Sequence, residues 1–492
     1  MERKLIVKGK SLAGDATKLT IMKVMTTALT MLSTMLLSRF RTLEEYGTYS
    51  QLQLVITVVV TILMAGLPNS INYFVAKASD IKEQRAFMSV YYTLCTISGI
   101  LSGVLLIILI PFIENYFNNS SISIYWYFLL LYPWTKIILS GIENILVVFS
   151  NIKKLVIFKI LYSVITLGVI AFCWVRNISF YTYMIFFLVT EIIFSVWVYK
   201  ISADTVHGMR ILFEKSRIKE ILSFSLPIGF SAIVGTVSIE LDKMMIGYFY
   251  NTEELAIYTN ASKEMPVTIV ATSITAVLMP QLVKLLHKNE KEKAIDLWKN
   301  ATNLSYICIA FLATALCVFA PEVITILYSE KYLPGTGVFR VYSLVLLLRV
   351  TYFGIILNAL GRTKFIFVSS LLSLLLNVIL NWVGYFTIGF TGPAVATFIS
   401  IAVTAFIQLL YTAKVTEMSV RKIFPWGFIG KITLLNGVSG IIVYFLKNVI
   451  SLDQFIGNIM ETIIIGLIWG GLYLLIVWKP IKRMWISLNR TE

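Results

Sequence analysis

The sequence predicts an all-α polytopic membrane protein with about 14 transmembrane helices, arranged as two parallel six-helix repeats plus two additional C-terminal helices. Three observations lead to this prediction: the composition, the length of the apolar runs and a segment that recurs in the second half. Of the 492 residues, 58% are hydrophobic and only 14% are charged, whereas soluble domains contain about a quarter charged residues. Apolar runs of roughly 20 residues, the length that crosses a bilayer, follow one another along the chain.

The predicted spans are apolar runs bounded by charged or turn residues. They lie at residues 16–38, 47–76, 87–113, 122–150, 155–175, 181–200, 221–247, 257–283, 301–320, 338–360, 365–386, 392–413, 428–446 and 459–478. The second, fourth and eighth runs are longer than a bilayer of roughly 30 Å requires. Pro68, Pro133 and Pro280 lie in these three runs, and each is a candidate kink site.

Basic residues predict which ends of the spans face the cytoplasm. Loops on the N-terminal side hold 28 of the 42 Lys and Arg residues, and the opposite loops hold 5. Because cytoplasmic loops are enriched in Lys and Arg, we expect both termini to be cytoplasmic. The first 15 residues lack a short apolar core with a small-residue cleavage site. We therefore interpret them as a retained tail and not as a signal peptide.

One segment recurs after 209 residues. Residues 40–50 read FRTLEEYGTYS and residues 249–259 read FYNTEELAIYT, so a Phe, two Glu and a Tyr coincide. Six spans return the chain to the same side, so the halves are expected to be parallel, with a pseudo-twofold axis along the membrane normal. The segment itself is interpreted as a structural corner after the first helix of each half.

The repeat also predicts the domain boundaries. We expect a six-helix bundle at 1–206, a second bundle at 207–425 and two further helices with a cytoplasmic tail at 426–492. Residues 207–220 are a cytoplasmic linker between the bundles. This basic linker is either an amphipathic helix on anionic headgroups or a solvated connector.

Five basic residues lie deep in spans or on polar faces: Lys23, Lys136, Lys243, Lys263 and Arg349. Each would cost at least about 2.5–3.5 kcal/mol if it faced lipid at mid-membrane. Several such residues together require a hydrated cavity. The sequence therefore predicts a central cationic cavity that binds substrate.

Polar residues in two spans follow helical spacing. In the first span the stripe is Lys23, Thr27, Thr30, Thr34 and Ser38, and in the seventh it is Thr236, Glu240 and Lys243. The 209-residue offset places Thr236 on Thr27 and Lys243 on Thr34. Two related stripes that face each other would line a central cleft. The alternative for the hydroxyls is hydrogen bonding between neighbouring helices, which is common in membrane bundles.

Acidic residues close to these bases suggest ion pairs and coupling sites. Glu240 lies one turn from Lys243, a spacing that allows an ion pair. Asp242 points elsewhere on the same helix and is expected to be a free carboxylate, so Glu240 and Asp242 are candidates for ion or proton coupling. In the fourth span, Glu143 is two turns from Lys136 and could neutralise it.

Two other polar features leave alternatives open. Arg349 has no acid in its own span, so its partner is either an anionic ligand or a carboxylate of another helix. Ser370, Ser373, Asn377, Asn381 and Gly384 form a stripe of small and polar residues in the eleventh span. We interpret this stripe as a surface that packs helices.

Motifs for soluble chemistry are absent from the sequence. It has no GxxxxGK[ST], GxSxG or HExxH motif, and its 4 Cys and 2 His residues lack metal-site spacing. We therefore expect no enzyme activity, no cofactor, no metal and no ATP-driven step. The positive charge follows the membrane loops, so we expect membrane lipids and not nucleic acid as partners.

At this point the chain resembles a known family. Its spans, its two repeats, the EEYGTYS and EELAIYT segments, the late Pro in the second and eighth spans and the LGRTK turn resemble the MOP superfamily. Within it, the chain is most similar to Wzx-type polysaccharide flippases. The resemblance implies movement of an undecaprenyl-pyrophosphate-linked oligosaccharide across a bacterial cytoplasmic membrane by alternating access, with a polysaccharide polymerase as a plausible partner. It also implies functional charges in lumen-lining helices, a role that we transfer to Lys23, Asp242, Lys243 and Arg349.

Other functions remain open. One is a lipid II-type flippase for peptidoglycan precursors, and another is a cation-coupled multidrug exporter of the same superfamily. An exporter of cationic drugs should have an acidic cavity, yet the deep residues are five bases against four acids, Glu143, Glu240, Asp242 and Glu264, with Glu191 as a further acid. A membrane glycosyltransferase or polymerase would usually carry a large external loop, and the longest external loop here is about residues 321–337.

Overall fold

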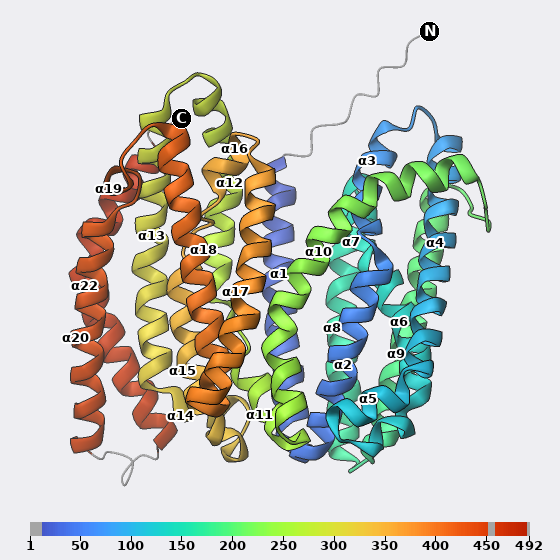
Figure 1. Cartoon of the computed structure of the whole chain (residues 1–492), viewed down its shortest axis with the longest axis horizontal. Helices are drawn as coiled ribbons and strands as arrows, with labels where there is room; N and C mark the ends of the chain where they lie inside the picture. Colours follow the sequence, from blue (N-terminus) through green and yellow to red (C-terminus); the bar gives the residue numbers. More distant parts are fainter. Residues whose placement is uncertain (1–11, 451–457, 490–492) are drawn as a thin grey trace. The chain divides into compact units, whose positions relative to one another are not determined.

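The computed structural model describes residues 12–450 and 458–489, and these residues form helices and connecting turns without a β-strand (Figure 1). Eleven helical segments are long and apolar enough to cross a membrane, or twelve if one bent pair is a single span. The all-helical, multi-pass membrane fold is thus confirmed. The number of about 14 spans is not, partly because Thr363–Thr416 is one apolar segment in this count although it contains two helices.

The described residues form two compact units. The first comprises residues up to Glu240 together with Gly247–Ala256, and the second comprises Leu241–Ile246 together with residues from Ile257 onward. Helix α10 (Lys215–Phe249) contributes to both units. The domain boundaries predicted at residues 206 and 425 stay predictions.

The first unit is a helical bundle that includes most of α10. In it α1 packs on α8, and α4 packs on α6, which also contacts α9. The other elements in chain order are α1 (Leu12–Phe40), α2 (Leu43–Met64), α3 (Leu67–Lys77), α4 (Ile81–Ile108), α5 (Ile110–Phe117), the 3-10 helix η1 (Ser120–Tyr125), α6 (Trp126–Ser140), α7 (Ile142–Val148), α8 (Ile152–Val175) and α9 (Phe180–Thr205).

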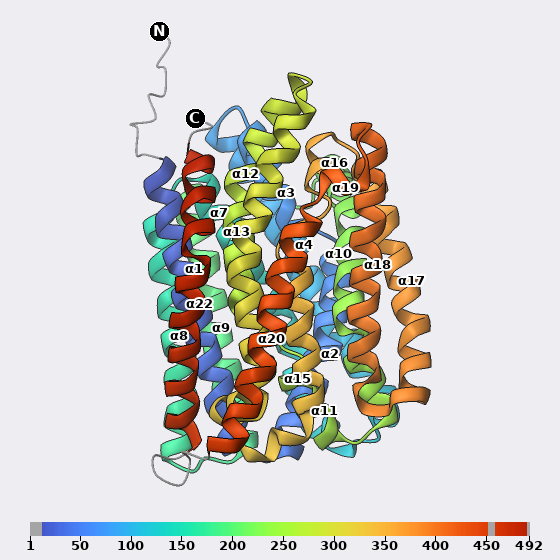
Figure 2. The ribbon, with the colours of Figure 1, turned by 90° about the vertical axis from the view of Figure 1, so that its left-hand side faces the viewer.

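The second unit repeats this plan and adds two helices. Helix α17 packs along α18, and α13 packs against both α20 and α22 (Figure 2). Its elements are the end of α11 (Thr252–Ala261), η2 (Pro266–Thr268), α12 (Ile269–His287), α13 (Lys291–Val318), α14 (Ala320–Leu327), η3 (Glu330–Gly335), α15 (Thr336–Val345), η4 (Leu346–Leu348), α16 (Ile355–Ala359), α17 (Thr363–Ile388), η5 (Gly389–Thr391), α18 (Gly392–Thr416), α19 (Val420–Ile423), α20 (Trp426–Ile450) and α22 (Asn458–Asn489).

The internal repeat predicted from the sequence is visible in the helix boundaries. Both ends of α4 recur 210 residues later in α13, and the same offset relates α5 to α14 and η1 to η3. A constant offset over three successive elements leaves no room for an insertion between them. The two halves of the chain therefore share one succession of helices.

The recurring segment marks the start of a helix in each half. Thr42 caps α2: its hydroxyl accepts a hydrogen bond from the Glu45 backbone N–H at 3.1 Å, and the Glu45 carboxylate accepts from the Thr42 N–H at 3.2 Å. Asn251 and Glu254 form the same reciprocal pair at the start of α11, at 2.8 and 3.2 Å. This capping box gives the second Glu of each segment a structural role.

The long predicted spans are interrupted, but only one of the interruptions lies at a predicted proline. Between α2 and α3, Ala65 and Gly66 have positive φ, and Pro68 lies in the first turn of α3. Pro133 and Pro280 instead lie inside α6 and α12. The fourth span breaks at Gly141, and the eighth breaks just before Pro266, because a residue that precedes proline avoids the helical conformation.

The linker between the predicted bundles is not an amphipathic helix. Helix α9 continues to Thr205, α10 begins at Lys215, and the residues between them are irregular. Two backbone N–H groups fix this connector to α4: Arg210 donates to Ser89 at 3.3 Å and Leu212 donates to Thr93 at 3.2 Å. The hypothesis of a helix lying on headgroups was therefore wrong. The predicted tail at residues 1–11 lies outside the described residues.

Candidate functional site

Two helix interruptions in the second unit bring Arg349 and Glu264 together. Arg349 follows η4, where the tenth predicted span loses its helical form until α16 begins, and Glu264 lies between α11 and η2. The guanidinium donates to Glu264 Oε1 through Nη2 at 2.8 Å and through Nε at 3.2 Å. Both side chains remain partly exposed, at 40% and 32%. Of the two alternatives for Arg349, the structure contains a carboxylate from another helix.

Two further predicted bases belong to the same unit. The Lys263 ammonium group donates to Asn260 Oδ1 at 3.0 Å, and Lys263 directly precedes Glu264. Lys243 is half-buried on α10, and its backbone N–H donates to Asp242 Oδ1 at 2.9 Å. Interrupted helices are the usual places where transporters bind charged substrates and ions, because unpaired backbone groups become available there.

Asp242 is a buried hydrogen-bond acceptor. Its side chain is only 1% exposed, and Oδ2 accepts a hydrogen bond of 2.9 Å from the Tyr258 hydroxyl and a second one from Tyr342. The prediction of a free carboxylate was thus wrong. The reason is that Tyr258 comes from the recurring segment and Tyr342 from α15, and the periodicity of α10 alone could not reveal either partner.

The cluster around Asp242 extends to α17 and α18. Tyr342 shares a hydrogen bond with the Thr397 side chain, and Asn377 Nδ2 donates to Thr397 Oγ1 at 3.2 Å. The amide oxygens of Asn377 and Asn381 are buried and accept no hydrogen bond. Buried oxygens of this kind suit a proton or a hard cation. The α17 stripe, which was predicted only to pack helices, therefore also carries unused acceptors.

In the first unit the ion pair differs from the one expected. Lys23 Nζ lies 3.3 Å from Glu143 Oε1, which joins α1 to α7. Lys136 instead donates to Thr57 Oγ1 at 2.7 Å. The predicted pairing of Lys136 with Glu143 was wrong because α6 ends at Ser140, so the helical face that would align them is interrupted at Gly141.

The predicted polar stripes lie on partly accessible faces of α1 and α10. Thr27, Thr34, Thr236 and Glu240 are half-buried and Thr30 is exposed. The Thr30 hydroxyl donates to the Thr26 carbonyl at 2.9 Å, which is the usual way for a hydroxyl to be satisfied within a membrane helix. A central cleft between the halves, lined by these stripes, stays a prediction.

The first unit has its own buried carboxylate. Glu191 on α9 is 1% exposed and accepts a hydrogen bond from Tyr162. Tyr49 and Tyr132 lie close enough to interact electrostatically with it. These two tyrosines correspond to Tyr258 and Tyr342 with offsets of 209 and 210. The repeat thus conserves a tyrosine pair beside a buried acid, although the acid comes from a different helix in each unit.

Comparison with known proteins places the chain in a family. The sequence model of the polysaccharide biosynthesis protein family matches residues 36–336. The chain belongs to the polysaccharide biosynthesis protein family. A relative of this family member is the probable low-salt glycan biosynthesis flippase Agl15 of Haloferax volcanii, 21% identical over 259 residues. That match spans 51% of this chain and 53% of the relative, so it covers about half the length of each.

Solved structures show that this polysaccharide biosynthesis protein has the fold of MOP superfamily transporters. The lipid II flippase MurJ in an inward closed conformation has a TM-score of 0.68 at 16% identity, with 93% of this chain and 98% of MurJ covered. The MATE transporter VcmN of Vibrio cholerae, determined as a mutant, has a TM-score of 0.57 at 15% identity, with 84% and 99% covered. The resemblance noted in the sequence is thereby confirmed.

Proposed function

We propose that this protein is a flippase that moves an undecaprenyl-pyrophosphate-linked oligosaccharide across the cytoplasmic membrane of a bacterium by alternating access. Its product would serve the synthesis of capsule, O-antigen or exopolysaccharide. Family membership supports a role in polysaccharide synthesis, and the transporter fold supports movement across the membrane without an enzymatic step. The undecaprenyl carrier and the sugar class come from the resemblance.

The observation that carries the proposal is the Arg349–Glu264 pair between two interrupted helices. A pyrophosphate that displaces the Glu264 carboxylate would gain the same two-pronged contact with the guanidinium, since Arg binds phosphate and carboxylate in similar geometry. Lys263, next to Glu264, and Lys243 would add positive charge. Lys23 and Lys136 would extend the cationic surface in the first unit, where Thr27, Thr30 and Thr34 offer hydroxyls for sugars, as Thr236 does on α10.

The Asp242 cluster is the proposed coupling site. A buried carboxylate held by two tyrosine hydroxyls, close to unused amide oxygens of α17, can take up a proton or a hard cation and release it when the helices move. Glu240, one turn away on α10, is the second candidate. An ion gradient would then drive transport, since the sequence has no nucleotide-binding motif.

The proposed setting follows from the distribution of basic residues. We place both termini in the cytoplasm and divide the protein into two six-helix bundles, at 1–206 and 207–425, followed by two helices. A polysaccharide polymerase would act on the transported repeat unit on the outer side. Cysteine substitutions in the loops of opposite predicted side, labelled with an impermeant maleimide, test this orientation.

Reconstitution tests the substrate class. Purified protein in proteoliposomes is given a fluorescent undecaprenyl-pyrophosphate oligosaccharide, and an impermeant quencher reports the fraction exposed on the outside. We expect the protein to move this lipid, Arg349→Ala to lose the activity, and Arg362→Ala, an exposed Arg outside the site, to retain it.

Parallel assays distinguish the alternatives. Faster movement of a lipid II analogue than of the oligosaccharide lipid would favour a peptidoglycan flippase. Accumulation of a cationic dye without movement of either lipid would favour a multidrug exporter. Either result would overturn the proposed substrate, and loss of all three activities in intact protein would overturn the transport proposal.

A further inference from the structure

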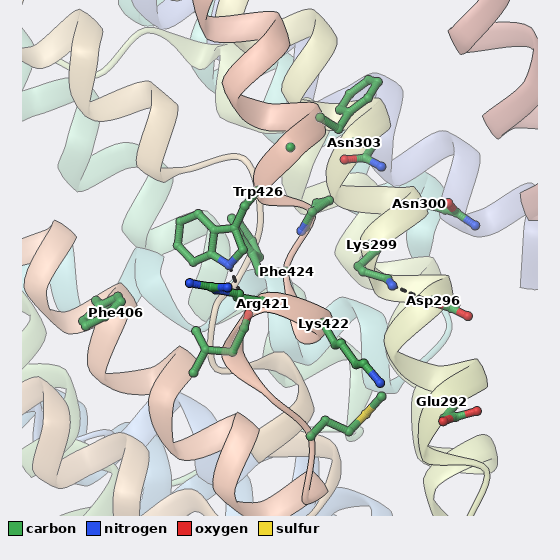
Figure 3. A pocket seen from close by; sticks show the side chains of 15 residues that line it. Glu292, Asp296, Lys299, Asn300, Asn303, Phe406, Arg421, Lys422, Phe424 and Trp426 are labelled. Atoms are coloured by element: carbon green, nitrogen blue, oxygen red, sulfur yellow. Dashed lines mark hydrogen bonds and ion pairs between the residues drawn. The ribbon is translucent and has the colours of Figure 1, made fainter.

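A cavity of about 1220 Å³ lies in the second unit, away from the Arg349 and Asp242 clusters (Figure 3). It forms where the first turns of α13 meet α19 and the start of α20. Polar side chains of α13 line one wall, basic residues of α19 line the other, and aromatic residues of α18 and α20 border it. Nothing in the proposed transport cycle uses this cavity.

The charges that line the cavity are not fully paired. Asp296 and Lys299 neutralise each other at 2.7 Å. Arg421 and Lys422 are exposed and form no ion pair within the described part of the chain, and the same is true of Glu292. Three bases against two acids leave a net charge of +1. Figure 3 shows that Arg421 and Lys422 approach from the side opposite Glu292 and Asp296.

A buried acceptor at one end of the cavity also lacks a partner. Asn303 lines the cavity and is only 9% exposed, yet its Oδ1 accepts no hydrogen bond. A buried carbonyl oxygen left unpaired is unfavourable, so such groups almost always meet a donor. A ligand in this cavity should therefore carry a hydroxyl or ammonium group as well as negative charge.

The surroundings of the cavity favour a lipid over a soluble ligand. Phe406 lines it and is 49% exposed, and Trp426 at the start of α20 is 42% exposed. Beyond them, Leu410 on α18 and Leu434 on α20 are exposed apolar residues, which face acyl chains in a multi-pass membrane protein. Trp is typical of the level of lipid headgroups. A ligand with a phosphate head and acyl tails would satisfy both environments.

We propose that this cavity binds the headgroup of an anionic phospholipid that carries hydroxyls, of the phosphatidylglycerol type. Its phosphodiester lies between Arg421 and Lys422 beside the first turn of α20, where a helix N-terminus also favours an anion. A glycerol hydroxyl donates to Asn303 Oδ1 and another to Glu292. The single negative charge of this lipid balances the +1 of the cavity, whereas an ethanolamine headgroup, being neutral overall, would not.

Native mass spectrometry of the delipidated full-length protein tests the site. The protein is titrated with phosphatidylglycerol and, separately, with phosphatidylethanolamine of the same acyl chains. We expect one phosphatidylglycerol to bind preferentially. The double variant Arg421→Gln/Lys422→Gln should weaken that binding by about 30-fold, since each Lys or Arg near a membrane surface contributes roughly a fivefold effect.

Two further variants keep the test specific. Lys153→Gln/Lys154→Gln removes two exposed lysines of the first unit and should leave the affinity unchanged. Asn303→Leu, checked for folding by its thermal unfolding profile, should reduce the preference for phosphatidylglycerol over a lipid that lacks hydroxyls, such as phosphatidic acid.

Three results would overturn the proposal. They are equal phosphatidylglycerol binding by the wild type and the Arg421/Lys422 variant, stronger binding of phosphatidylethanolamine, and equal affinity for glycerophosphoglycerol without acyl chains. The last result would point to a soluble phosphate ligand.

Discussion

The Tyr258 hydroxyl donates a hydrogen bond of 2.9 Å to Asp242, and Tyr342 donates to the same carboxylate oxygen. Tyr258 belongs to the segment that recurs in both halves, so a feature that marks a helix start also supplies a partner to a buried acid. Two hydroxyl donors stabilise a carboxylate that burial would otherwise disfavour. This arrangement makes Asp242 the sharpest test of coupling.

Asp242→Asn should make transport insensitive to an imposed ion or proton gradient, because the amide cannot take up or release a proton at this position. Initial rates in proteoliposomes with and without the gradient measure the effect. Glu253→Gln, which changes an exposed carboxylate in the same segment, serves as the control. Unchanged gradient dependence in Asp242→Asn would exclude the coupling role.

Arg349→Ala should abolish surface polysaccharide while the protein stays in the membrane, since a pyrophosphate would lose its two-pronged contact. The exchanged variant Arg349→Glu/Glu264→Arg separates binding from a purely structural ion pair. If Arg349 binds substrate, the exchange should not restore polysaccharide. Restoration to wild-type levels would show that the pair only holds the two helix interruptions together.

Lys447 and Glu322 provide the structural counterpart of that experiment. Their side chains form a largely buried ion pair between α20 and α14, with exposed fractions of 15% and 8%. Glu322→Gln should lower the free energy of unfolding by about 3–5 kcal/mol, because it leaves an unpaired buried ammonium group. Thermal unfolding in detergent measures this loss. The exchange Lys447→Glu/Glu322→Lys should recover part of it, and equal stability of all variants would contradict the assignment.

Asn251→Ala should destabilise the start of α11 by about 1 kcal/mol, since the Glu254 backbone N–H loses its side-chain acceptor. Thr42→Ala should do the same at the start of α2. Thermal unfolding in detergent detects both changes, and Asn251→Asp, which keeps an acceptor, should be close to neutral. A neutral Asn251→Ala would mean that the capping box contributes nothing measurable.

Gly103→Ala should reduce the amount of folded protein, because the new Cβ would lie 2.0 Å from the Leu130 carbonyl oxygen where α4 packs on α6. Separating the two helices typically costs about 1–3 kcal/mol. Gly168→Ala is the matched control: it lies within α8 with open space around it, so Ala should be neutral or slightly stabilising there. Size-exclusion profiles of the two variants compare them directly, and similar yields would contradict the close helix contact.

The sequence by itself determined the membrane class, the succession of helices and the internal repeat. These features depend on local composition and on an offset of 209 to 210 residues, both of which can be read along one dimension. It also identified residues that matter structurally, since Lys23, Lys136, Lys263 and Arg349 all make polar contacts between or beside helix interruptions.

Only the tertiary structure decided which groups meet. Asp242 has a partner 100 residues away in Tyr342, Arg349 has one 85 residues away in Glu264, and Lys136 contacts Thr57 instead of Glu143. Helical periodicity aligns residues along one continuous helix, so it fails where Gly141 or the turn before Pro266 interrupts a span. Those interruptions lie where the candidate site forms, because an interrupted helix can turn charged side chains toward a neighbouring element.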